Sequence, residues 1–141
     1  IKAVGTGPGI SPYNPHNLRN RNTAEPLISI AGPASNLLVA IIFGLIIRGL
    51  SYLNFSSIPL ISIFSFVVLI NVSLAIFNLI PIPPLDGSKI LFAFLPVHLK
   101  HRFHEISEKY GLIIILAVVM FLPNVISPVI FSIFKLITGI N

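Results

Sequence analysis

The sequence has 141 residues, of which 55% are hydrophobic and only 9% are charged. In a soluble domain roughly a quarter of the residues are charged, because its surface must be hydrated. This composition therefore excludes an ordinary soluble domain. The net charge of +5 comes from few, scattered basic residues, which argues against a nucleic-acid-binding protein. The absence of cysteine excludes disulfides and thiolate zinc sites. The composition indicates a membrane protein.

The first segment, residues 1–25 (IKAVGTGPGISPYNPHNLRNRNTAE), is polar and rich in Gly, Pro and Asn. These residue types favour turns and extended backbone over helix, so we expect a loop at the membrane surface. The sequence starts at Ile1 and shows no positively charged leader followed by a short apolar core. This segment is therefore not a signal peptide mistaken for part of the fold, and we expect that an N-terminal portion of the protein is missing.

Three long apolar segments follow, at residues 27–50, 58–80 and 111–138. A helix needs about 20 mostly apolar residues to cross the hydrocarbon core of a membrane, and each segment is long enough. The last one is interrupted by Pro123 and Pro128, and its length allows one crossing with a kink but not two. We predict a membrane span at each of the three segments.

The stretch between the second and third spans is irregular. Residues 81–96 (PIPPLDGSKILFAFLP) break at three prolines and resume as an apolar helix from about Gly87. Residues 97–110 (VHLKHRFHEISEKY) are polar, and we expect a helix at the membrane surface. The predicted fold is an all-α, polytopic transmembrane helical bundle. It forms one membrane-embedded domain over 1–141, with three to four membrane helices and a proline-broken segment that carries Asp86.

Basic residues set the expected topology. They precede the first span and surround the polar segment after the second, whereas residues 51–57 carry no charge. Because positive charge is retained on the cytoplasmic side, we place residues 1–25 and 97–110 in the cytoplasm and 51–57 outside.

Asp86 is the chain's only aspartate and follows an uncharged run that begins at Gly49. A carboxylate near a membrane interior is costly unless it is paired or bound to metal, which makes Asp86 a candidate metal ligand or catalytic group. Two structural explanations, taken together, are as open as the functional one: a cap on the helix that starts at Gly87, and an ion pair with Lys89. Asn78, at the end of the second span, can stabilise an oxyanion, but its residue type alone favours an interhelical hydrogen bond.

A histidine-rich segment is the second place where metal ligands gather. It contains His98, His101 and His104 beside Glu105 and Glu108. The order is H-x-x-H-E, whereas a zincin helix needs H-E-x-x-H to set both imidazoles around the base. Basic residues are interspersed, as on a solvated helix, so we interpret the segment as surface and not as a zinc site.

Three stretches carry a resemblance to a known family. They are AGPASN (31–36), FNLIPIPPLDGSKIL (77–91) and SPYNPHNLRNRN (11–22). With them the sequence resembles the site-2 protease family of intramembrane zinc metalloproteases, in its small bacterial and archaeal form. The N-x-x-P-x-x-P-L-D-G pattern is long and specific, whereas the G-P-x-x-N element alone is weak. The resemblance implies the cytoplasmic membrane of a prokaryote.

The resemblance also implies a function, zinc-dependent proteolysis of membrane-protein segments. In this family two histidines of H-E-x-x-H and the aspartate of the LDG motif hold Zn²⁺. Matched by position, Asp86 is the third zinc ligand and Asn78 assists near the scissile carbonyl. H-E-x-x-H is absent from these residues. We expect it before Ile1, and we expect this fragment by itself to be inactive.

The expected partners are the lipid bilayer and a substrate membrane helix that unwinds locally. The segment Gly5–Gly9 is a candidate edge strand for the extended substrate. Two other classes remain open on the sequence alone. One is an inactive relative that binds membrane segments without cleaving them, and the other is a transporter or channel component, because broken helices also build transport sites.

Overall fold

The computed structural model describes residues 21–55, 57–83 and 85–140, with side chains from residue 24 onward. Within these residues there are four helices and no strand: α1 (Arg21–Tyr52), α2 (Ile58–Leu79), α3 (Asp86–Phe94) and α4 (Val97–Thr138). The helices α1, α2 and α4 are long and apolar enough to cross a membrane, with mean hydropathies of 2.2, 2.6 and 2.5 in their most apolar windows. The all-α, polytopic fold is thereby confirmed for the described part of the chain.

The first helix starts earlier than the sequence indicated. It begins at Arg21, so the last residues of the expected loop 1–25 are helical. The loop prediction rested on glycine, proline and asparagine; the glycines and prolines all lie at or before Pro15, and only Asn22 of the three residue types lies in Arg21–Glu25. The candidate edge strand at Gly5–Gly9 lies outside the described residues.

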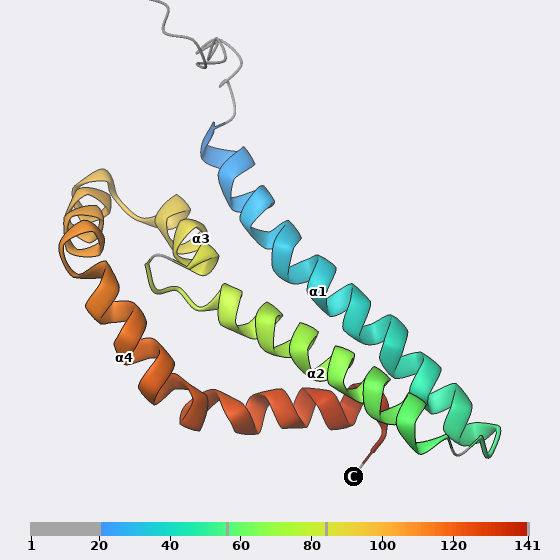
Figure 1. Cartoon of the computed structure of the whole chain (residues 1–141). Helices are drawn as coiled ribbons and strands as arrows, with labels where there is room; N and C mark the ends of the chain where they lie inside the picture. Colours follow the sequence, from blue (N-terminus) through green and yellow to red (C-terminus); the bar gives the residue numbers. More distant parts are fainter. Residues whose placement is uncertain (1–20, 56, 84, 141) are drawn as a thin grey trace, which may run out of the picture.

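The helices α1 and α2 run side by side in opposite directions (Figure 1). A short turn joins them, with Asn54 in the left-handed region at φ 53°. The Phe43 and Phe64 rings pack edge to face with centroids 5.2 Å apart. A cluster of fully buried residues lies between the two helices: Ala40, Ile47, Val68 and Val72. Most other large apolar side chains point outward, as expected for helices that face lipid.

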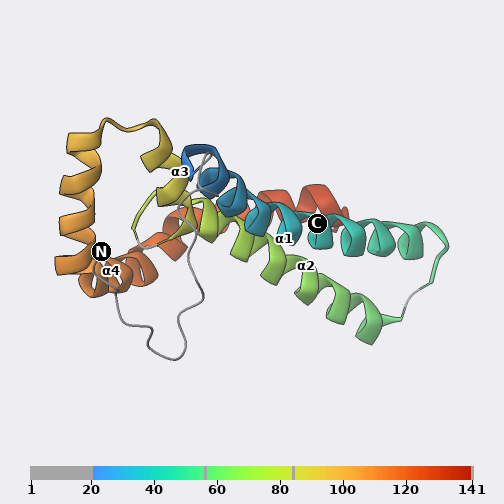
Figure 2. The same ribbon diagram turned by 90° about the horizontal axis from the view of Figure 1, so that it is seen from above.

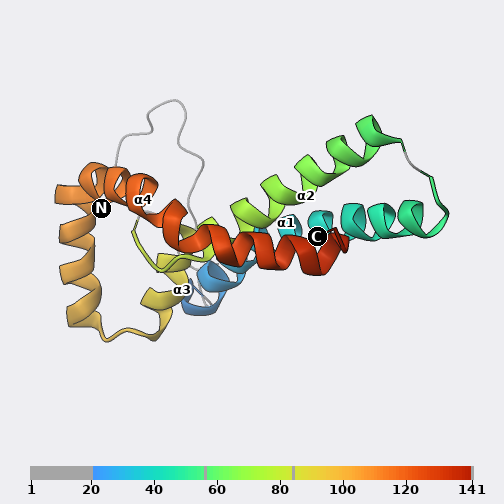
Figure 3. The ribbon, with the colours of Figure 1, turned by 90° about the horizontal axis from the view of Figure 1, so that it is seen from below.

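The helix α4 joins the polar segment 97–110 and the apolar segment 111–138 in one run of 42 residues. A straight helix of that length is about 60 Å long, twice the thickness of a hydrocarbon core. The helix is bent, however. Its first part crosses the end of the bundle and the rest returns along α1 and α2 (Figures 2 and 3). Pro123 and Pro128 lie within the returning part, where each removes a backbone hydrogen bond and favours a kink.

The far end of α4 is tied to α1. The Arg48 guanidinium donates hydrogen bonds to the carbonyl oxygens of Leu136 and Ile137, the latter from Nε at 2.8 Å. Gly44 of α1 packs directly against Ile137. These contacts satisfy carbonyls that have no partner within the last turn of a helix. They hold α4 on the bundle at the end opposite to α3.

Candidate functional site

The site begins where α2 ends. Pro81 and Pro83 have no backbone N–H and cannot continue the helix, so the chain leaves α2 at Leu79. Two tight turns follow: Ile80 N donates to the Phe77 carbonyl at 3.2 Å, and Leu85 N donates to the Ile82 carbonyl at 2.9 Å. They redirect the chain so that α3 starts beside the last turn of α2.

Gly87 sets how closely the two helices approach. A Cβ atom placed on Gly87 would collide with the carbonyl oxygens of Leu79 and Ile80 and would lie 2.5 Å from the Leu79 carbonyl carbon. Any side chain at this position would push the start of α3 away from α2, because backbone atoms cannot yield as a flexible side chain can. Gly87 and its neighbour Ser88 are both buried at this contact.

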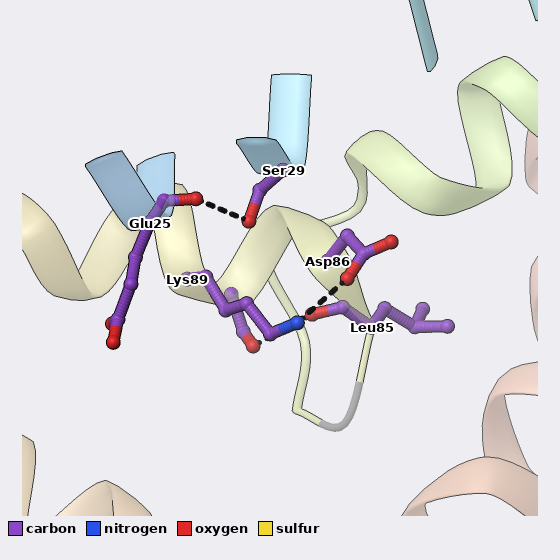
Figure 4. A network of polar contacts seen from close by, with 6 residues as sticks. Glu25, Ser29, Leu85, Asp86 and Lys89 are labelled. Carbon is purple, nitrogen blue, oxygen red and sulfur yellow. Dashed lines mark hydrogen bonds and ion pairs between the residues drawn. The ribbon is translucent and has the colours of Figure 1, made fainter. Parts of the chain in front are cut away.

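Asp86 is the first residue of α3, and its carboxylate is partly exposed. Its Oδ1 lies 2.9 Å from Lys89 Nζ, and the two side chains are 43% and 55% exposed (Figure 4). The second oxygen, Oδ2, makes no bond to any described residue. Of the two structural explanations for Asp86, the ion pair with Lys89 is present. The cap is not, because Leu85 holds the capping position and no side chain caps the helix.

Asn78 lies in the last turn of α2, the turn against which Gly87 packs. Its side chain is half-buried and forms no hydrogen bond with the residues that the structure describes. Asn71 lies about two turns earlier on the same helix. In contrast to Asn78, it has a hydrogen-bond partner, because its Nδ2 donates to the Val67 carbonyl at 2.8 Å. The structure therefore places Asn78 and Asp86 on adjoining helix ends, although no bond joins their side chains.

The Asp86 carboxylate could serve as one ligand of a metal ion. An exposed ion pair contributes at most about 1 kcal/mol, so Lys89 holds the carboxylate weakly and a metal ion can replace it. In the described part of the chain, no three His, Cys, Asp or Glu side chains come together to hold a metal. Asp86 can supply one oxygen ligand, and a metal ion bound there would need its other ligands from residues outside that part.

The histidine segment does not supply them. His98, His101 and His104 lie on the first turns of α4 and are exposed or nearly so. His104 Nε2 is 3.3 Å from Glu108 Oε1, and both of these side chains are 73% exposed. The segment has the solvated character that the sequence indicated. His101 and His104 instead line a cavity at the start of α1.

The family model for peptidase family M50 matches residues 12–122, which include α2, the proline connector and Asp86. The chain belongs to peptidase family M50. This confirms the resemblance to site-2 proteases that the motifs indicated. It also makes the three apolar helices those of a membrane protein.

This M50 chain also has a curated relative in Bacillus subtilis (strain 168), a protein named "Putative zinc metalloprotease YwhC". The two are 36% identical over 110 residues, which cover 74% of this chain and 50% of the relative. The M50 chain thus spans about half the length of that relative. No solved structure gives a significant match.

Proposed function

We propose that the complete protein is a zinc-dependent intramembrane metalloprotease in which Asp86 is the third zinc ligand. One observation carries the proposal. The chain's only aspartate stands at the start of α3 with one carboxylate oxygen unbonded among the described residues, and Gly87 fixes that helix start against the end of α2. Membership of family M50 and the zinc metalloprotease name of the relative support it.

The other ligands in this proposal are two histidines of an H-E-x-x-H motif from polypeptide outside these 141 residues. Two imidazoles and one carboxylate are a ligand set of catalytic zinc sites, which keep one position open. A zinc ion held there supplies Lewis acidity, which activates a water molecule and polarises a peptide carbonyl. Asp86 contributes the negative charge of the set, and its short helix limits where the ion can lie.

Asn78 is proposed to donate a hydrogen bond from its amide to the oxygen of the scissile carbonyl. Its amide is half-buried at the end of α2 and has no described hydrogen-bond partner. A donor fixed in advance at the place where negative charge develops stabilises the transition state without reorganisation. The adjacent connector is rigid because prolines restrict its backbone, and this keeps the donor in place.

The proposed substrate is a segment of another membrane protein, unwound so that its peptide bond reaches the site. The proposed location is the cytoplasmic membrane of a prokaryote, with residues 1–25 and 97–110 on the cytoplasmic side. The distribution of basic residues supports this orientation, since the α1–α2 turn carries no charge and the start of α4 carries several.

The test uses the complete protein and a membrane-embedded peptide substrate in vesicles. We expect Asp86→Asn to abolish cleavage while the protein remains folded, because the amide cannot replace an anionic ligand. Glu108→Gln is the matched control: it also removes one acid, but from an exposed pair with His104 on α4, and it should cleave normally. Undiminished cleavage by Asp86→Asn would contradict the proposal.

A further inference from the structure

A cavity of about 390 Å³ opens at the end of the bundle where α1 begins. Its wall is shared by the start of α1, by α3 and by the first turns of α4. Within the part of the chain that the structure describes, four basic side chains line it, Lys89 from α3 and Lys100, His101 and His104 from α4. Of the described residues that line it, Glu25 is the one acid. Nitrogen-bearing side chains of α3 and α4 therefore line the same cavity.

The rest of the lining is apolar. Phe92 of α3 packs against Phe103 of α4 with ring centroids 5.9 Å apart, and this contact supports the wall between the two helices. Val97, at the junction between α3 and α4, is 69% exposed beside it. The lining thus combines basic groups that suit a charged ligand with apolar side chains that suit a hydrocarbon chain.

The position of the cavity along the helices determines how deep it would lie in a membrane. It is at the end of the bundle where α1 and α4 begin, which holds the charged segment 97–110. The opposite end carries the uncharged α1–α2 turn. The apolar part of α1 that is long enough to cross a membrane starts at Ala24, beside the cavity, so a crossing by α1 would place the opening near the level where head groups meet water. Basic pockets between helices at this level on the cytoplasmic side suit phosphate head groups.

We propose that the cavity binds the phosphate of an anionic phospholipid, with Lys89 and Lys100 as its main contacts. Ammonium groups on two helices can contact different phosphate oxygens, and the Phe92 side of the cavity receives the start of an acyl chain. A phosphate ester is the shared chemistry of a lipid head group and a free phosphate. Only the lipid also uses the apolar wall.

Lys89 connects the cavity to Asp86. Its side chain lines the cavity while its Nζ lies 2.9 Å from Asp86 Oδ1, with Glu25 of α1 on the other side (Figure 4). A phosphate in the cavity competes with Asp86 for this ammonium. Occupation by lipid therefore releases the carboxylate for a metal ion. This second step rests on the proposed function, whereas binding of the lipid does not.

The test compares the complete protein in vesicles of phosphatidylcholine alone and in vesicles that also contain phosphatidylglycerol. Native mass spectrometry after detergent extraction reports the lipid that stays bound. We expect phosphatidylglycerol to be retained and Lys100→Gln to weaken its binding about fivefold, the effect of one basic contact to an anionic surface. Lys109→Gln is the matched control, because Lys109 is on the same helix but lies over the Tyr110 ring and outside the cavity lining.

Two results would overturn the lipid site. One is equal loss of phosphatidylglycerol in Lys100→Gln and Lys109→Gln. The other is inorganic phosphate binding as tightly as the lipid, which would assign the cavity to free anions. The coupling has its own readout: zinc should bind wild-type protein more tightly with phosphatidylglycerol present, and Lys89→Gln should show no such difference.

The outcomes of the two proposals are separable. Retained lipid with no effect on zinc affinity would overturn the coupling through Lys89 and leave the lipid site supported. Retained lipid in a protein that binds no zinc in any vesicle would contradict the metalloprotease proposal instead.

Discussion

Gly87 lies against the carbonyl group of Leu79, with no room between them for even a methyl group. This contact joins the first turn of α3 to the last turn of α2, and therefore joins the helix end that carries Asp86 to the one that carries Asn78. The position of the only aspartate depends on a glycine next to it in the chain. A substitution that leaves every proposed functional side chain intact can therefore still displace the site.

Gly87→Ala tests that dependence. The added methyl group must separate α3 from α2, and overpacking of this kind costs typically about 1–3 kcal/mol of stability. We expect a lower thermal unfolding midpoint and loss of cleavage in the complete protein. Gly111→Ala is the control, because a Cβ at Gly111 meets nothing within 4 Å. In that helix it should be neutral or stabilising by up to about 1 kcal/mol. Similar behaviour of the two variants would contradict the role of the contact.

Arg48→Met should loosen the far end of α4. The guanidinium donates to the carbonyls of Leu136 and Ile137, and a hydrogen bond from a charged group contributes about 1.5–3 kcal/mol. We expect a loss of that order in the free energy of unfolding, measured by denaturant titration in detergent. Lys135→Met also removes a positive charge from the last turn of α4 but breaks no bond between described residues. A larger loss in Lys135→Met than in Arg48→Met would refute the assignment.

Lys89→Gln separates the ion pair from the metal site. The pair is exposed, so its loss should change stability by less than about 1 kcal/mol. Because the proposed site needs Asp86 and not Lys89, zinc content should be retained. Metal analysis of the purified complete protein measures this directly. A loss of zinc in Lys89→Gln would mean that the lysine is part of the metal site and would require a different account of Asp86.

Asn78→Ala distinguishes a role in catalysis from a role in packing. Removal of a donor to a developing oxyanion lowers kcat about 10²–10³-fold, while folding and zinc content should stay the same. Asn71→Ala is the matched control, since Asn71 bonds within its own helix to Val67. It should leave kcat unchanged. If Asn78→Ala instead unfolds the protein with no separate effect on kcat, an interhelical hydrogen bond is the better explanation.

The sequence predicted the spans and the broken segment because both depend on local composition. Long apolar runs form helices wherever lipid is the solvent, and prolines such as Pro81 interrupt a helix in any surroundings. The start of α1 was predicted less well. The glycines and prolines up to Pro15 led to the prediction of a loop that extended over residues 21–25 as well. The continuity of α4 was also not visible, since a change from polar to apolar residues alters where a helix lies and not whether it continues.

The candidate site was predicted only in part, for a similar reason. Asp86 stands out in sequence as a lone acid, and the LDG motif singles it out further. The role of Gly87 depends on how close α3 comes to the Leu79 carbonyl, and the cavity depends on three elements meeting around Lys89. The glycine of the motif was the available signal for the first, since a glycine directly after a proposed ligand is typical of a close backbone approach. No local pattern could have indicated the cavity.

Zinc content of the complete protein with and without Asp86 tests the central claim most directly. The protein is purified with Asp86→Ala beside wild type and beside Glu108→Gln, and metal analysis gives the zinc bound to each. We predict about one zinc in wild type and in Glu108→Gln, and a loss in Asp86→Ala larger than the 10–100-fold weakening typical of changes outside the ligand set. Full zinc occupancy in folded Asp86→Ala would contradict the claim that Asp86 is a zinc ligand.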